Sequence, residues 1–318
     1  MPKKILIYAI LSCTFPTIAI AQDALIMSID LVRHGDRSSV CAIAGDKNPA
    51  DQELGILTAE GTQQSIALGK LLRRTYIDEA HLLPRDYQAE SVYVRSTDRQ
   101  RTIDTAQAIN AGLYPGAKIP VNTVTTNQDE ILVAKPDYHI SSLISRYFNQ
   151  RHTWQIMQRD NQDKFTLWSK WSGMPIENFT QLDCLADNLS YKNKHHLSLP
   201  AGFDQQSIAE INKLDESVIL QDFQQNKFPN GTRFLQTVQT YFIKTMKHQT
   251  ELKYVLFVGH DSTLLSVMQS LNKPLEHYPG YNARLNFSLY ENNRGYFIKV
   301  TYDGKIILEK SVTENLDI

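Results

Sequence analysis

The N-terminal half of the chain alternates apolar runs with amphipathic helical patterns. Residues 24–33 become apolar on both faces toward their end, which indicates a central strand covered by helices. Residues 58–76 carry apolar positions at helical spacing. Residues 91–95 predict a short strand, and residues 97–100 have the spacing of a capping box that opens a helix through residue 111. This order of strand, helix, strand and helix favours an α/β fold.

The C-terminal third continues the same pattern. Residues 231–248 predict a helix with one apolar face, and residues 254–259 form a nearly continuous apolar strand. His260 and Asp261 follow this strand and precede a predicted helix over residues 262–271. Polar turns then separate three further predicted strands, at residues 285–290, 296–302 and 305–308.

Residues 131–229 differ from the rest, because they are polar, contain all three tryptophans and show helical pieces without a strong strand. We therefore predict an open, mainly parallel central sheet flanked by helices, built from residues 22–130 and 230–318. Residues 131–229 are predicted to form a smaller, mostly helical insertion that caps the sheet.

The first residues have the pattern of an export signal. Lys3 and Lys4 precede an apolar stretch over residues 5–20, and Ala19-Ile20-Ala21 fits a signal-peptidase site, so residues 1–21 are predicted to be a signal peptide. The product would be exported, either periplasmic or secreted. Acylation of Cys13 is the competing interpretation. No later stretch has the length of a membrane span, so no membrane partner is expected after cleavage.

Charge and cysteine content bear on the kind of partner the protein binds and on whether it forms a disulfide. The chain has 33 basic and 34 acidic residues, a net charge of −1, which does not predict a nucleic-acid-binding surface. Of its three cysteines, Cys41 and Cys184 lie outside the predicted signal. In an oxidising compartment such a pair is compatible with one disulfide, which we expect, or with two buried thiols.

Charged side chains follow three of the predicted strands. Ligands of open α/β sheets bind at the carboxyl ends of the strands, so these segments are expected to meet at one edge. The expected site comprises Arg33, His34 and Arg37 after the first strand, Arg95 at the end of the second, and His260 and Asp261 after the late strand.

Three guanidinium groups around one point require a multiply charged anion, and their forked donors match phosphate oxygens. A histidine can serve as the nucleophile of phosphoryl transfer, and a carboxylic acid can protonate the leaving oxygen. The residue types therefore predict phosphoryl-transfer chemistry at this site.

The run Leu31-Val32-Arg33-His34-Gly35-Asp36-Arg37-Ser38 resembles the RHGxRxP signature of the histidine acid phosphatases, the acid phosphatase and phytase branch of the histidine phosphatase superfamily. Ser39 stands where that signature usually has proline. Further similar motifs follow in the family's order along nearly all of the mature chain: Leu57-Thr58-x-x-Gly61, Arg95-Ser96-Thr97-Asp98 with Arg101-Thr102, Trp168-Ser169-Lys170 and Gly259-His260-Asp261-Ser262-Thr263.

The resemblance implies a role for each matching residue. His34 would form a phosphohistidine intermediate, and Asp261 would protonate the leaving alcohol. The resemblance implies phosphate binding by Arg33, Arg37 and Arg95, with His260 stabilising charge in the transition state. No metal or cofactor is implied, and the substrates would be small-molecule phosphate monoesters. The reference pKa of an aspartic acid is about 3.9, so activity is expected to decline toward neutral pH.

Several alternatives remain open at this stage. His34 and Asp36 with His260 and Asp261 could instead hold a divalent metal, although the flanking arginines would repel it. A phytase, a sugar phosphatase, a mutase and a non-catalytic phospho-ligand binding protein are further candidates. Asp261 could act as a helix N-cap. Asp36 is expected to orient a neighbouring arginine and His195 to lie at the surface, and the C-terminal hairpins could pair two subunits into a homodimer.

Overall fold

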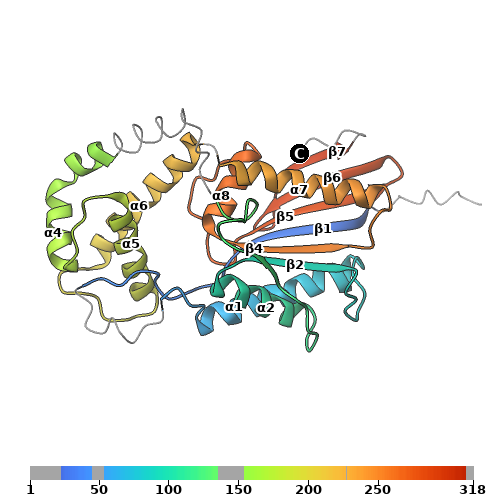
Figure 1. Ribbon diagram of the computed structural model, residues 1–318, viewed down its shortest axis with the longest axis horizontal. Helices are drawn as coiled ribbons and strands as arrows, with labels where there is room; N and C mark the ends of the chain where they lie inside the picture. The colour runs from blue at the N-terminus through green and yellow to red at the C-terminus, as the bar shows by residue number, and fades with distance from the viewer. Residues whose placement is uncertain (1–22, 45–53, 135–153, 227, 313–318) are drawn as a thin grey trace, which may run out of the picture.

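A computed structural model describes residues 23–44, 54–134, 154–226 and 228–312, and its core is a seven-stranded mixed sheet (Figure 1). The strand order is β3-β2-β4-β1-β5-β6-β7. The strands are β1 (Ala24–Arg33), β2 (Val92–Thr97), β3 (Asn122–Val124), β4 (Tyr254–Gly259), β5 (Arg284–Asn292), β6 (Gly295–Tyr302) and β7 (Lys305–Val312). Every strand predicted from the sequence forms, whereas β3 was missed because three residues carry too little pattern.

The two halves of the sheet run differently. The strands β3, β2, β4 and β1 pair in parallel, as predicted for an α/β core. Beyond β1, the strands β5, β6 and β7 pair antiparallel. Short turns after Asn292 and Tyr302 explain the β5–β6 and β6–β7 pairs, because connections of this length join only antiparallel neighbours.

Helices cover both faces of the sheet (Figure 1). One face packs against α1 (Ala59–Arg73), its π-helical continuation η1 (Arg74–Glu79) and α2 (Gln100–Leu113), and the other against α7 (Pro229–Met246) and α8 (Asp261–Ser270). Leu31 and Val32 of β1 belong to opposite cores and are both fully buried. This burial explains why two adjacent residues near the end of β1 are both apolar although they face opposite sides of the sheet.

The predicted capping box at residues 97–100 does not form. Thr97 is the last residue of β2, and α2 begins at Gln100 after Arg99, whose side chain makes no capping hydrogen bond. The hydroxyl of Thr97 lies 2.8 Å from that of Thr102 instead. The strand therefore runs two residues beyond Arg95, so Arg95 lies within β2 and not at its end.

Three further helices form a separate group beside the sheet, here called the cap: α4 (Gln162–Ser172), α5 (Phe179–Lys194) and α6 (Gln205–Gln225) (Figure 1). They enclose their own apolar cluster, which includes Trp168, Leu185 and Ile211. Ile43, in the segment after β1, joins this cluster and so ties the cap to the sheet. Leu132 packs in the sheet core, so the start of the predicted insertion at residue 131 belongs with the sheet.

The predicted signal peptide, residues 1–21, lies outside the described residues. Among the residues that the structure describes, no helix combines the length and apolar character needed to cross a bilayer.

Candidate active site

The ends of β1 and β4 bring the two motif histidines together. Arg33 pairs with Gly259 at the end of the parallel ladder, and the N–H of His34 donates to the carbonyl of Gly259 at 3.0 Å. The rings of His34 and His260 consequently lie edge to face with their centroids 5.5 Å apart. Two segments more than 200 positions apart in the chain thus meet at the carboxyl edge of the sheet, as the sequence predicts.

His34 is held with one ring nitrogen occupied and the other available. Its Nδ1 lies 2.8 Å from the carbonyl oxygen of Gly35, and because a carbonyl only accepts, Nδ1 carries the proton and donates. In the neutral ring Nε2 then has a free lone pair. Burial, followed by the positive charges of Arg33 and Arg101, holds the pKa of His34 well below its usual range. The imidazole is therefore neutral, as a nucleophile must be.

Arg33 and Asp261 form a buried ion pair beside this nucleophile. Nη2 of Arg33 lies 2.9 Å from Oδ2 of Asp261, and the other carboxylate oxygen accepts from the N–H of Ser262 at 2.7 Å. Burial alone would raise the pKa of Asp261, but Arg33, then His34 and His260, hold it below its ordinary value. Asp261 is the first residue of α8, and His260 takes the N-cap position. Asp261 is thus not the N-cap, although one of its oxygens accepts from a first-turn N–H, and the residue lines the cavity.

Arg37 is paired with the cap. Its Nη2 lies 2.7 Å from Oδ1 of Asp187 on α5, and Nη1 donates to the carbonyl of Ser38 at 3.0 Å. Burial would lower the pKa of Arg37, but Asp187 raises it above its ordinary value. Oδ2 of Asp187 also accepts from the hydroxyl of Ser39 at 2.7 Å. Ser39, which replaces the signature proline, therefore anchors the loop to the cap.

The structure separates Arg95 from the other predicted site residues. Nη2 of Arg95 lies 2.7 Å from Oδ1 of Asp129, and Arg95 does not line the cavity that contains His34 but a different surface hollow, together with Arg233. Since β2 ends at Thr97, Arg95 is not the strand-end residue that the sequence suggested. The prediction that Arg95 binds phosphate beside His34 is thus not supported by its position.

Arg101, in the first turn of α2, lines the cavity instead, together with Arg99. Among the described residues, no carboxylate lies within ion-pair distance of Arg101. Burial and then the charge of Arg37 lower its pKa to about 10. The resemblance includes Arg101-Thr102 as a matching motif but implies no role for it. The signal in the sequence is its position in the first turn of a helix that starts at the sheet edge.

His260 orients this arginine. Its Nδ1 accepts from Nη2 of Arg101 at 3.3 Å, so in the neutral ring Nε2 carries the proton and donates to the hydroxyl of Thr97 at 2.9 Å. Burial, and then Arg101, lower the pKa of His260 to about 3. In this state His260 is a neutral acceptor for Arg101, rather than the cationic group that would stabilise transition-state charge directly.

These groups surround one cavity of about 580 Å³ between the sheet edge and the cap. Arg33, Arg37, Arg99 and Arg101 lie on the sheet side with His34, His260 and Asp261, and residues of α5 and α6 line the cap side. The volume exceeds that of a phosphate group and falls in the range of small-ligand sites.

Comparison with known proteins agrees with this arrangement. The model of the histidine phosphatase superfamily (branch 2) matches residues 46–195. Human testicular acid phosphatase is 29% identical over 316 residues, covering 87% of this chain and 70% of the relative. Human prostatic acid phosphatase is 25% identical over 306 residues, covering 85% and 75%. These similarities support the histidine acid phosphatase family for this chain.

Solved structures of phytases share the fold. The phytase of Klebsiella sp. ASR1 has a TM-score of 0.64 at 17% identity, covering 88% of this chain and 83% of that one. The Hafnia alvei phytase in complex with myo-inositol hexakis sulphate has a TM-score of 0.65 at 17% identity, covering 88% and 84%. At these identities the likeness establishes the mixed sheet with flanking helices, and not the substrate.

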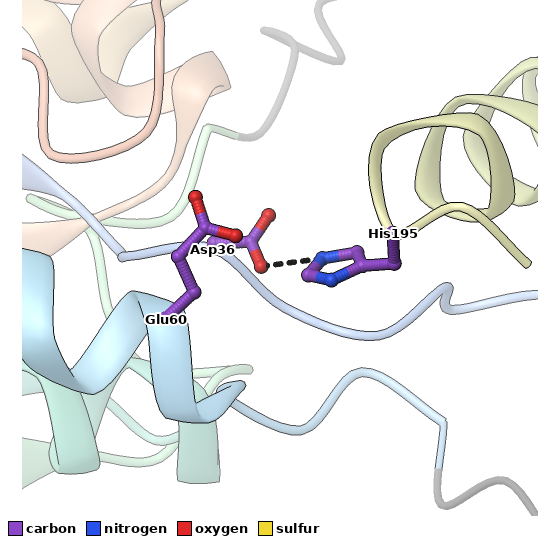
Figure 2. A group of neighbouring side chains, drawn as sticks. All are labelled: Asp36, Glu60 and His195. Carbon is purple, nitrogen blue, oxygen red and sulfur yellow. Dashed lines mark hydrogen bonds and ion pairs between the residues drawn. The ribbon is translucent and has the colours of Figure 1, made fainter.

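Asp36 links the signature loop to the end of α5 rather than to an arginine. Oδ2 of Asp36 accepts from the Thr58 hydroxyl at 2.6 Å and lies 2.7 Å from Nε2 of His195, the contact drawn in Figure 2. Lys194 lies 2.6 Å from the other oxygen of Asp36 and 3.2 Å from Glu60. Asp36, Glu60 and His195 are close enough to hold a metal, but the ammonium group of Lys194 already supplies the cation. His195 is thus a tertiary contact and not a surface histidine.

Cys41 and Cys184 are neighbouring free thiols in the structure, so the predicted disulfide is not formed in it. Burial is the largest cause of a raised pKa at both thiols. The pair connects the segment after β1 with α5, beside Asn188, whose amide donates to the Cys41 carbonyl at 3.0 Å.

Proposed function

We propose that this protein hydrolyses phosphate monoesters by transferring the phosphoryl group to Nε2 of His34 and then to water. The observation that carries the proposal is a neutral, buried imidazole beside guanidinium groups whose charge is only partly compensated. Among the described residues, the Nε atoms of Arg33, Arg37 and Arg101 are buried without hydrogen-bond partners. Such donors are costly to bury unless an anion accepts from them.

The first step forms a bond between His34 Nε2 and phosphorus while the ester oxygen departs with the bonding electrons and takes a proton from Asp261. Arg33, Arg37 and Arg101 hold the phosphoryl oxygens as the charge redistributes. In the second step water attacks phosphorus, Asp261 accepts a proton from it, and the bond to Nε2 breaks. His34 is then neutral again and inorganic phosphate leaves. His260 acts through Arg101, as the 3.3 Å contact suggests.

The proton on Asp261 arrives with the substrate in this proposal. The pKa of Asp261 is depressed by Arg33 before a ligand enters, so the carboxylate is then ionised. A bound phosphate competes with Asp261 for the guanidinium group of Arg33 and adds negative charge, and both effects raise the pKa of Asp261. A phosphate monoester itself holds a second proton below about pH 6. Activity is therefore expected to be highest at acidic pH and to fall above this value.

Trapping the intermediate tests the proposal. Rapid acid-free quenching during turnover of a ³²P-labelled ester should give labelled protein whose label resists alkali and is lost in acid. The label should map to His34 and be missing from His34→Ala, while His196→Asn, a change at an exposed histidine, should keep it. Turnover without any such adduct on His34 would refute the mechanism.

The metal-dependent alternative is tested separately. His34, His260 and Asp261 lie among arginines, and Asp36 is committed to Thr58, His195 and Lys194. We therefore expect full activity after dialysis against excess chelator. Loss of activity that returns only on adding a divalent cation would favour metal-assisted hydrolysis.

We also propose export to the periplasm or the extracellular space, supported by the signal-like residues 1–21 and by relatives that include a lysosomal acid phosphatase. N-terminal sequencing of the mature protein should begin at Gln22.

In the periplasm or the extracellular space, we propose that a disulfide oxidant converts the adjacent thiols of Cys41 and Cys184 to a disulfide, releasing two protons and two electrons to the oxidant. Thiol counting on the protein unfolded under non-reducing conditions should then find no free thiol at either position.

A homodimer is proposed through the outer edge of β7, which pairs only with β6 among the described strands. Unpaired backbone groups at a sheet edge can accept a strand from a second copy. Sedimentation equilibrium should give twice the monomer mass, and a monomeric mass at all concentrations would contradict the proposal.

A further inference from the structure

The cap side of the cavity carries charge of the opposite sign from the sheet side. On α5 the lining residues repeat at intervals of three and four, which places them on one helix face, and the same holds on α6. These residues are Asp183, Ala186, Asp187 and Ser190 on α5, and Asn212, Asp215 and Glu216 on α6. The adjacent faces of both helices supply apolar residues of the cap core, and Ala186 belongs to both sets.

Two of these carboxyl groups have no partner within the described part of the chain. Asp187 is committed to Arg37 and Ser39, and Glu216 accepts from the N–H of Tyr278 at 2.7 Å. Asp183 and Asp215 make no comparable contact, and Oδ1 of Asp215 is buried without a hydrogen-bond partner. Partly buried carboxyl groups aimed at a cavity are acceptors for a donor that enters it.

The electrostatics of this pair agree with such a role. Burial, then Asp187 and Asp261, raise the pKa of Asp183 to about 6. Burial, then Asp183 and Asp187, raise the pKa of Asp215 to about 8. Burial and the neighbouring carboxylates cause both shifts, and Arg37 offsets only part of the shift of Asp183. An ammonium group placed there would allow both carboxylates to ionise, whereas a second anionic group would find no counter-charge.

The geometry points to phosphate monoesters of amino alcohols as the preferred substrates, with the phosphate on the arginines and the ammonium group on Asp183 and Asp215. The inference rests on the proposed phosphatase function and deepens it by naming the alcohol. It also predicts weak activity on polyanionic esters such as myo-inositol hexakisphosphate, because further phosphates would face the acidic cap.

Three esters of nearly equal size test the charge preference: 2-aminoethyl phosphate, 2-hydroxyethyl phosphate and carboxymethyl phosphate. At pH 6 we expect kcat/KM to decrease in that order, with the aminoethyl ester favoured over the carboxymethyl ester by roughly tenfold or more, since unit charges at close range interact strongly in a partly buried site. Equal kcat/KM values for the three esters, or a preference for the carboxymethyl ester, would overturn the inference from measurements on the wild-type protein alone.

Variants then assign the preference to the cap. Asp183→Asn with Asp215→Asn should reduce the ratio of aminoethyl to carboxymethyl kcat/KM several-fold, whereas Asp163→Asn, at an exposed position of α4, should leave it unchanged. An unchanged ratio in the double variant would overturn the assignment. Hydrolysis of 2-hydroxyethyl phosphate without an amine preference removes this inference alone, while failure to hydrolyse any of the three removes the proposed function as well.

Discussion

A histidine that must attack phosphorus at acidic pH has to remain neutral there, and the surroundings of His34 do this in two ways. Burial and two nearby arginines, Arg33 and Arg101, disfavour its protonated form, and the contact to the Gly35 carbonyl fixes the tautomer that leaves the lone pair on Nε2. Of these two arginines, Arg33 also lowers the pKa of Asp261 and so keeps it ionised until a phosphate enters. At the scale of single residues, substrate binding and proton supply are therefore coupled through Arg33.

Arg101, and not Arg95, lines the cavity, and this assignment can be tested by substitution at the two positions. Arg101→Lys keeps the charge but loses the fork held by His260, so kcat/KM should fall roughly 10- to 100-fold, the value of one charge-assisted hydrogen bond. Arg95→Lys is the matched control, because Arg95 pairs with Asp129 outside the cavity. Steady-state kinetics on one ester suffices, and a larger loss in Arg95→Lys would restore the sequence-based assignment.

Asp261→Asn tests the proton donor. The amide cannot supply a proton to the leaving oxygen, so kcat on an alkyl phosphate should fall by about 10²- to 10⁴-fold. An aryl phosphate with an acidic phenol needs no such help and should lose less. The ratio of the two losses isolates proton transfer from the lost contact with Arg33, which affects both esters. Equal losses would argue for a purely structural role.

At the scale of elements, the signature loop depends on a close approach to α1. A Cβ on Gly61 would lie 2.1 Å from the carbonyl oxygen of Asp36, and one on Gly35 would lie 2.8 Å from that of Gly61. These are contacts to backbone, which cannot rotate away. The glycines therefore allow the end of β1 and the start of α1 to pack directly, with the Asp36 network fixing their relation to α5.

Gly61→Ala should consequently lower the free energy of unfolding by about 1–3 kcal/mol or more, the usual cost of overpacking. Gly280→Ala is the matched control, since a Cβ there meets no atom within 4 Å. Urea denaturation followed by circular dichroism measures both. If the two variants lose the same stability, the close packing of loop and helix is not the cause.

At the scale of the whole molecule, the cap completes the site by bringing acidic side chains over a basic sheet edge. Burying acidic side chains in this way lowers the free energy of unfolding when they are ionised, and Asp215 is an example. Its pKa is about 8 in the folded protein against 3.8 for an ordinary aspartate. The folded state thus favours the protonated form, and this contribution to stability is fully present below about pH 4 and lost as the pH rises toward 8.

Asp215→Asn should flatten this pH dependence, because the amide is neutral throughout. Relative to the wild type, the variant should gain stability between pH 5 and pH 8, measured as the urea midpoint at each pH. Asp163→Asn on α4 serves as the control and should track the wild type. An identical pH dependence in Asp215→Asn and the wild type would show that Asp215 is ionised in the folded state.

The sequence by itself determined six of the seven strands, the helices that follow them and the chemistry at the ends of β1 and β4. These features follow from local periodicity and from residue types next to one another, so His34, Arg33 and Asp261 could be placed together from strand order alone. The short β3 and the end of β2 carried too little pattern to be located.

Only the tertiary structure decided which arginine joins the site and what faces it. Arg95 and Arg101 are equally plausible in sequence, and the choice depends on the two extra residues of β2 and on the carboxylate of Asp129. Likewise the pairing of Asp187 with Arg37, and the unpartnered Asp183 and Asp215, arise from contacts across the chain. Side-chain direction and charge compensation are properties of packed surfaces, and a linear pattern does not contain them.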